Sequence, residues 1–195
     1  MTQLTVWSDP ITAMQVAHPF LGPLMNAALS CLCESVSTIP NPPANCCFRV
    51  GTEVVHDLGL FEDLCCEGIA YVMLGELYPA SEQFPRPDLV RQATGACAPA
   101  TWAVYLKMGL IRCIPVGGVD PLSCFQWNNA AVQNVYDTMA LSRAACCLRT
   151  FVVNEWDQIG MSVVIERQTQ GNPSGGCIER SITFVTQIPN IECCP

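Results

Sequence analysis

The segment from Glu67 to Tyr78 predicts a β-strand that is apolar on both of its faces. Successive side chains of a strand point to opposite faces, and neither set in this segment is polar. One set comprises Ile69, Tyr71, Met73 and Leu77, and the other comprises Ala70, Val72, Leu74 and Tyr78. Such a strand lies at the centre of a sheet or has a partner on its outer side. We therefore expect something to cover its second face.

The composition points to a folded chain that does not function alone. Half of the 195 residues are hydrophobic and only 13% are charged, which excludes a disordered chain. So few charged residues leave little polar surface for a monomer, which favours an oligomer or a subunit of a larger assembly. The length suits an N-terminal arm over residues 1–19 and a single domain over residues 20–195.

The chain is acidic, and its charged residues are unevenly distributed along the sequence. The net charge is −8, and the 35 residues from Val50 to Phe84 contain seven acidic residues but no Lys or Arg. A protein that binds nucleic acid tightly carries a basic stripe, and this sequence has none. The acidic window is either a solvated face or a surface that repels DNA or docks a basic partner.

The sequence predicts a protein that is made and kept in the cytosol, unless it leaves by cell lysis. The first basic residue is Arg49, so the charged start of a secretion signal is missing. Residues 11–33 are apolar, but Pro19, Pro23 and several polar residues interrupt them. These interruptions argue against a membrane span.

Fourteen cysteines include four adjacent pairs, at 46–47, 65–66, 146–147 and 193–194. Neighbouring Cα atoms lie ~3.8 Å apart, whereas a relaxed disulfide needs about 4.4–6.8 Å, so we expect the members of a pair not to bond each other. One sulfur of each pair should point inward and the other elsewhere. The candidates for a disulfide or a buried thiol are Cys46, Cys65, Cys66, Cys113, Cys146, Cys147, Cys177 and Cys193.

Three interpretations of the cysteines stay open. They are buried free thiols in a cytosolic fold, disulfides that form late in an oxidising medium, or zinc ligands. Zinc is the weakest of the three, because the sequence has no C-x2-C motif and its two histidines lack ligand spacing.

The predicted elements alternate between helices and strands. Apolar spacing predicts a helix over 21–37, and Asp120-Pro121 predicts the start of a second helix that runs to about 148. Strands are expected over 46–55, 67–78, 101–113, 160–168 and 177–188. The order favours an α+β fold in which helices pack on one side of a mainly antiparallel sheet. The expected buried stripe of the second helix is Trp127, Ala131, Val135, Met139 and Leu148.

No catalytic or cofactor motif is present in the sequence. There is no G-x-S-x-G, no H-E-x-x-H, no phosphate-binding loop and no dinucleotide fingerprint. We therefore predict no enzyme activity, no cofactor and no metal site.

The order of several segments resembles the tail-terminator proteins of siphophages that infect actinobacteria. The segments are DLCCEGIAYVMLGELYP, FPRPD, ATWAVYLKMGLIRCIPV, DPLSCFQWNNAAVQNVYDTMALSRAACCL and GGCIERSITFVTQIPNIECC. In those proteins a cysteine pair opens a strand, R-C-x-P follows the next strand, and a long helix ends in a cysteine pair. Here Cys65-Cys66, Arg112–Pro115 and Cys146-Cys147 occupy those places. The similarity covers residues 57–194, with a departure at Glu179-Arg180, where small residues are expected.

The resemblance implies a structural virion protein in the neck between head and tail, assembled in the host cytoplasm. Such proteins form a ring, commonly of six subunits, that caps the tail tube, ends its polymerisation and joins it to the head–neck connector. The implied partners are the tail tube protein and the head–tail stopper or adaptor proteins. Genomic DNA would pass through an acidic lumen without sequence-specific binding, and no membrane is involved. The candidate subunit or partner interface is Ile69, Tyr71, Met73, Phe84 and Tyr105.

Two alternatives remain at this stage. One is a head–tail stopper or adaptor ring of the same neck, which would bind the portal complex rather than tube ends. The other is a cytosolic cysteine-rich metal or redox protein, which about one zinc ion per chain would favour.

Overall fold

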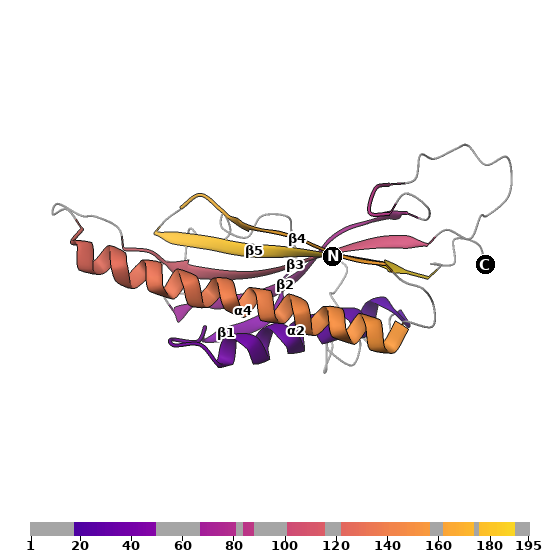
Figure 1. Cartoon of the computed structure of the whole chain (residues 1–195), viewed down its shortest axis with the longest axis horizontal. Helices are drawn as coiled ribbons and strands as arrows, with labels where there is room; N and C mark the ends of the chain where they lie inside the picture. Colours follow the sequence, from indigo (N-terminus) through magenta and orange to yellow (C-terminus); the bar gives the residue numbers. More distant parts are fainter. Residues whose placement is uncertain are drawn as a thin grey trace, which may run out of the picture.

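The chain folds as an α+β protein in which two helices pack against a five-stranded, mostly antiparallel open sheet (Figure 1). The computed structural model describes residues 18–49, 67–80, 84–87, 101–115, 122–156, 162–173 and 176–189. The helices are α2 (Leu21–Ser37) and α4 (Cys124–Trp156). The strands are β1 (Asn45–Arg49), β2 (Ile69–Pro79), β3 (Trp102–Cys113), β4 (Val163–Gln170) and β5 (Cys177–Ile188).

The strand order in the sheet is β1-β2-β3-β5-β4. β1 runs parallel to β2 and pairs with its first five residues, 69–73, while the other three neighbouring pairs are antiparallel. Register shifts interrupt β2 between Leu74 and Leu77 and β4 between Ile165 and Gln168. The long strands β3 and β5 pair over their full length, and they form the centre of the sheet.

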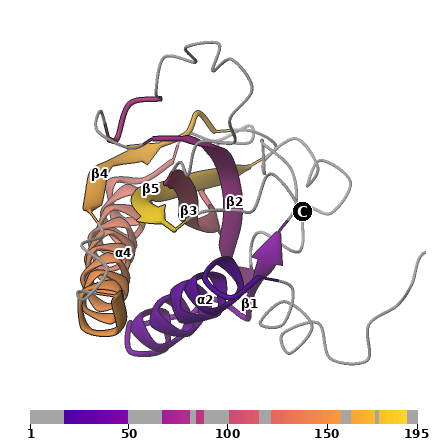
Figure 2. The ribbon, with the colours of Figure 1, turned by 90° about the vertical axis from the view of Figure 1, so that its right-hand side faces the viewer.

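Both helices lie on the same side of the sheet, so the molecule has two layers (Figure 2). The core lies between these layers, where apolar side chains of β2, β3 and β5 meet the two helices. Its fully buried members include Leu24, Leu32, Val72, Leu106, Leu141, Leu148 and Phe184. Burial of apolar surface in this layer is the main force that holds the helices on the sheet.

Helix α2 has clear local signals at both ends. His18 Nδ1 accepts hydrogen bonds from the backbone N–H groups of Phe20 and Leu21, at 3.2 and 3.1 Å. These bonds satisfy donors that have no partner within the helix. Thr38 and the prolines that follow it end α2, since proline cannot continue the backbone ladder.

The α+β fold class and the order of elements predicted from the sequence are confirmed. α2 and β5 span the predicted residues, and β2 and β3 differ by two residues or fewer at each end. The helix predicted over 121–148 instead spans Cys124–Trp156. Residues 1–17 of the predicted arm and 50–55 of the first predicted strand lie outside the described residues. Neither described helix combines the length and the apolar character that crossing a bilayer requires.

Candidate interaction surface

The first half of α4 exposes large apolar side chains on the side that faces away from the core. Ser123 and Gln126 form a capping box that starts this helix: Gln126 N–H donates to Ser123 Oγ, and Ser123 N–H donates to Gln126 Oε1. The exposed side chains are Phe125 (73%), Trp127 (54%), Val132 (55%), Val135 (62%), Tyr136 (41%) and Met139 (54%). Trp127 lies 18 residues, or five full helical turns, before the buried Ala145, so it is on the side of α4 that faces the sheet. We call the other five residues the α4 outer face.

This placement corrects the buried stripe predicted for the helix. Of the five residues expected in the core, only Leu148 is buried, while Trp127, Ala131, Val135 and Met139 are exposed. The side that packs against the core combines three alanines with four larger apolar residues, and most of it lies in the second half of the helix. Its members are Asp137, Ala140, Leu141, Ala144, Ala145, Leu148, Val152 and Trp156. The alanines let α4 approach α2 and the sheet closely, and the large apolar side chains of its first half are exposed.

The α4 outer face carries no charge. Between Cys124 and Ser142 the only charged residue is Asp137, and it is buried against the core. The first exposed charge along the helix is Arg143. From the exposed fractions and about 150–200 Å² for a whole side chain, the five residues expose on the order of 500 Å². Patches of that size, poor in charge and rich in aromatic residues and Met, are typical of protein–protein interfaces.

Asp137 fixes the position of this half of α4. Arg112 of β3 donates to both carboxylate oxygens of Asp137, from Nε at 3.2 Å and from Nη2 at 3.0 Å. Gln133 Nε2 donates to Asp137 Oδ1 at 3.0 Å and to the carbonyl oxygen of Pro40 at 3.2 Å. A two-point bond between Arg and a carboxylate fixes direction as well as distance. α4 is thereby held to β3 and to the turn that follows α2.

A pocket of about 320 Å³ lies beside this ion pair, between α4 and the neighbouring ends of β3 and β5. Its wall is mainly apolar, and Trp127 forms part of it. The other lining residues include Leu110, Ile114, Ala130, Pro173 and Ile178, together with Arg112 and Arg180. The volume is at the lower end of the range for ligand pockets. We call it the Arg180 pocket.

Arg180 is the unusual charge of this pocket. Its guanidinium donates to Thr138 Oγ1 at 2.6 Å and to Gln170 Oε1, both of which are neutral. Burial lowers the pKa of Arg180 below its ordinary value, and the nearby Asp137 carboxylate acts in the opposite direction. Because Asp137 is already bound by Arg112, these three groups leave the pocket with an excess positive charge.

The opposite face of the sheet holds a second, smaller cluster. Ile69, Tyr71, Met73, Ile111 and Cys177 are all buried there. Tyr71 Oη–H donates to Glu179, which also forms an ion pair with Lys107. Burial raises the pKa of the Tyr71 hydroxyl above its ordinary value, and the hydrogen bond to Glu179 adds to this effect. Glu179, the residue at which the sequence departs from the resembling family, therefore has a role within this fold.

This cluster changes the interface predicted from the sequence. Ile69, Tyr71 and Met73 were expected to contact another subunit, but each is at most 6% exposed within the single chain. Over residues 69–73 the second face of β2 is thus covered within the chain, and these three residues form core. Phe84 and Tyr105 are half-buried and pack with Tyr78 and Val164 around Ala80, Ala103 and Val185.

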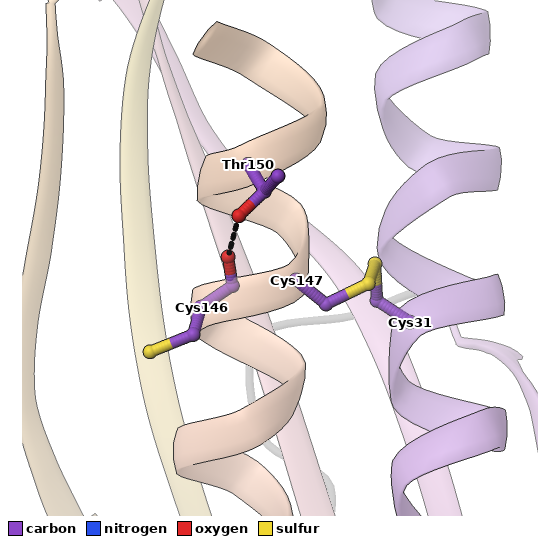
Figure 3. The surroundings of a disulfide bond; sticks show 4 residues. All are labelled: Cys31, Cys146, Cys147 and Thr150. Atoms are coloured by element: carbon purple, nitrogen blue, oxygen red, sulfur yellow. Dashed lines mark hydrogen bonds between the residues drawn. A yellow bond between two sulfur atoms is a disulfide. The ribbon is translucent and has the colours of Figure 1, made fainter. Parts of the chain in front are cut away.

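Two disulfides tie α2 to its neighbours. Cys31 of α2 bonds Cys147 of α4, with the Cα atoms 5.7 Å apart (Figure 3). Cys33 of α2 bonds Cys46 of β1, with the Cα atoms 5.8 Å apart. Cys31 and Cys33 are not among the candidates predicted from the sequence.

The remaining described cysteines divide into two groups. Cys113 and Cys177 each take part in a disulfide. Cys47, Cys124 and Cys146 are exposed free thiols. Cys146 was a candidate for a disulfide or a buried thiol, and in the structure it is neither. Figure 3 shows its side chain pointing away from Cys147, as expected for adjacent residues on a helix. Cys65, Cys66 and Cys193 lie outside the described residues.

No metal centre is formed by the residues that the structure describes, since no three His, Cys, Asp or Glu side chains gather there. The chain matches neither a protein-family model nor a curated protein.

Proposed function

We propose that this protein is a subunit of a ring that caps a siphophage tail tube, a tail terminator. The observation that carries the proposal is the α4 outer face, about 500 Å² of uncharged, largely apolar surface. A chain with so much exposed apolar surface and so few charges is suited to an assembly. We assign this face to contact with the neighbouring protein of the tail, the tail tube protein.

The order of elements supports a tail-terminator-like version of the α+β fold. The R-C-x-P motif of the resembling family falls at the end of β3, where Arg112 binds Asp137. The family's cysteine pair falls on α4, where Cys147 bonds Cys31. Two of the three places that carried the resemblance are thus points at which α4 is attached to the rest of the molecule.

The chemistry of the chain suits a virion neck. A net charge of −8 would let DNA pass a ring of such subunits without adhering to it. Disulfides persist outside the reducing cytosol, so bonds such as Cys31–Cys147 would form once the assembled virion leaves the host cell. The stopper or adaptor proteins of the neck would contact the ring on the side away from the tube.

The proposal is tested by mixing the purified chain with tail tubes that lack a terminator. We expect rings, commonly of six subunits, bound at one end of the tubes in negative-stain images, together with an arrest of tube elongation. A stopper would instead bind the portal–adaptor complex and ignore tube ends. A chain that stays single at high concentration and leaves tubes unbound would refute both, and about one zinc ion per chain would favour the metal-protein alternative.

A further inference from the structure

A second exposed apolar site lies on β2, away from α4. β1 pairs with β2 only as far as Met73, so among the described residues β2 has no neighbour on that edge from Leu74 onward. On the other edge of β2, the register shift between Leu74 and Leu77 interrupts the pairing of the same residues with β3. Both leucines are 37% exposed, and Glu76 between them is exposed as well. The edge thus offers two aliphatic side chains and one carboxylate.

The chemistry of this edge complements that of the Arg180 pocket. The pocket has an apolar wall and an excess positive charge, and the edge offers apolar side chains beside a negative charge. An opposite charge placed near Arg180 would supply the carboxylate partner that its neutral neighbours, Thr138 and Gln170, do not provide. A volume of about 320 Å³ accommodates an aliphatic side chain.

The two sites lie at opposite corners of the sheet. Leu74 and Leu77 are paired with Leu106 and Val104 of β3, whereas the pocket adjoins Arg112 of the same strand. At about 3.3 Å per residue, this places them roughly 20 Å apart along β3. They also lie on different sides of that strand, since β2 flanks one side and β5 the other.

We propose that residues 74–77 of one copy of this chain dock in the Arg180 pocket of the next copy, with Glu76 facing Arg180. Because the two sites differ and do not overlap, the contact is head-to-tail and repeats from copy to copy. A contact of this type closes into a ring when the rotation between copies allows it. The inference rests on the proposed ring and names the surfaces that join its subunits.

Charge reversal tests this pairing. Glu76→Arg and Arg180→Glu should each weaken self-association at least about tenfold, as for other close charge pairs at interfaces. The double variant E76R/R180E should recover most of the loss, because it restores an opposite pair. The control is Glu34→Arg, which reverses an exposed glutamate on α2 and should leave association unchanged. Mass is measured by light scattering over a range of protein concentrations, and ring formation is also scored on tail-tube ends.

The outcomes separate the inference from the proposed function. If rings form and cap tubes, but the double variant is no better than the single variants, the docking pair is wrong and the terminator assignment stands. If the wild-type chain never associates, alone or on tubes, both fail. Glu76 is exposed, so a loss caused by Glu76→Arg with an unchanged melting temperature cannot be attributed to misfolding.

Discussion

At the scale of single residues, Gly109 decides how the outer face of the sheet packs. A Cβ atom at this position would collide with the ring and hydroxyl of Tyr71, which is fully buried. We expect Gly109→Ala to lower the free energy of unfolding by about 1–3 kcal/mol, the usual cost of overpacking a core. The control is Gly171→Ala, where the nearest atom lies at an ordinary 3.5 Å and the change should stay within about 0.5 kcal/mol. Equal urea midpoints for the two variants would contradict this account.

Tyr71 also gives a prediction for alkaline pH. Its pKa is raised in the folded chain, mainly by burial and further by the bond to Glu179. Above a pH of about 10 the unfolded chain loses this proton, while the folded chain keeps it, so folded stability must fall as the pH rises. The expected slope is about 1.4 kcal/mol per pH unit. Tyr71→Phe should remove that part of the slope, measured as urea unfolding between pH 9 and 11 with free thiols blocked; a slope identical to that of the wild type would show that Tyr71 does not contribute.

At the scale of elements, the two disulfides should differ in how much they stabilise the fold. Cys31–Cys147 joins residues 116 apart in sequence, and Cys33–Cys46 joins residues 13 apart. If a disulfide acts mainly by restricting the unfolded chain, the longer loop should contribute about 4–5 kcal/mol and the shorter about 3. Replacing each pair by two alanines and comparing urea midpoints tests this order. A larger loss from the shorter loop would mean that loop length does not decide the contribution of these disulfides.

The elements themselves could be predicted from the sequence, but the direction in which α4 faces could not. α2 combines one apolar stripe with a proline stop, so its bounds and its buried side followed directly. In α4, the first half carries large apolar residues on its exposed side, whereas the buried side includes the small Ala140, Ala144 and Ala145 beside larger residues such as Leu141 and Leu148. Hydrophobic spacing favours the large residues as core, whereas close packing against α2 selects the small ones. The uncharged run from Cys124 to Tyr136 was the available signal that the large residues face a partner.

Contacts between distant strands were also beyond the sequence. Tyr71 and Glu179 lie 108 residues apart, and only the register of β2, β3 and β5 brings them together. The apolar alternation of β2 correctly indicated that both faces are covered over residues 69–73, but residues 74–77 are exposed. It could not indicate whether a second subunit or the same chain covers the second face, because both alternatives require apolar side chains at the same positions of the strand.

At the scale of the whole molecule, a substitution on the α4 outer face should affect assembly and leave folding unchanged. Val135 is 62% exposed, so Val135→Glu should leave the melting temperature nearly unchanged while placing a charge in the middle of the proposed contact with the tube. We expect binding to tail-tube ends to fall at least about tenfold, since burying an unpaired charge is strongly unfavourable.

Val153→Glu is the matched control. It makes the same substitution at an exposed valine of α4, about 27 Å further along the helix at 1.5 Å per residue, beyond Arg143 and Arg149. Tube binding that is lost equally in both variants would mean that helix charge matters and the α4 outer face does not; binding retained by Val135→Glu would move the tail contact to another surface.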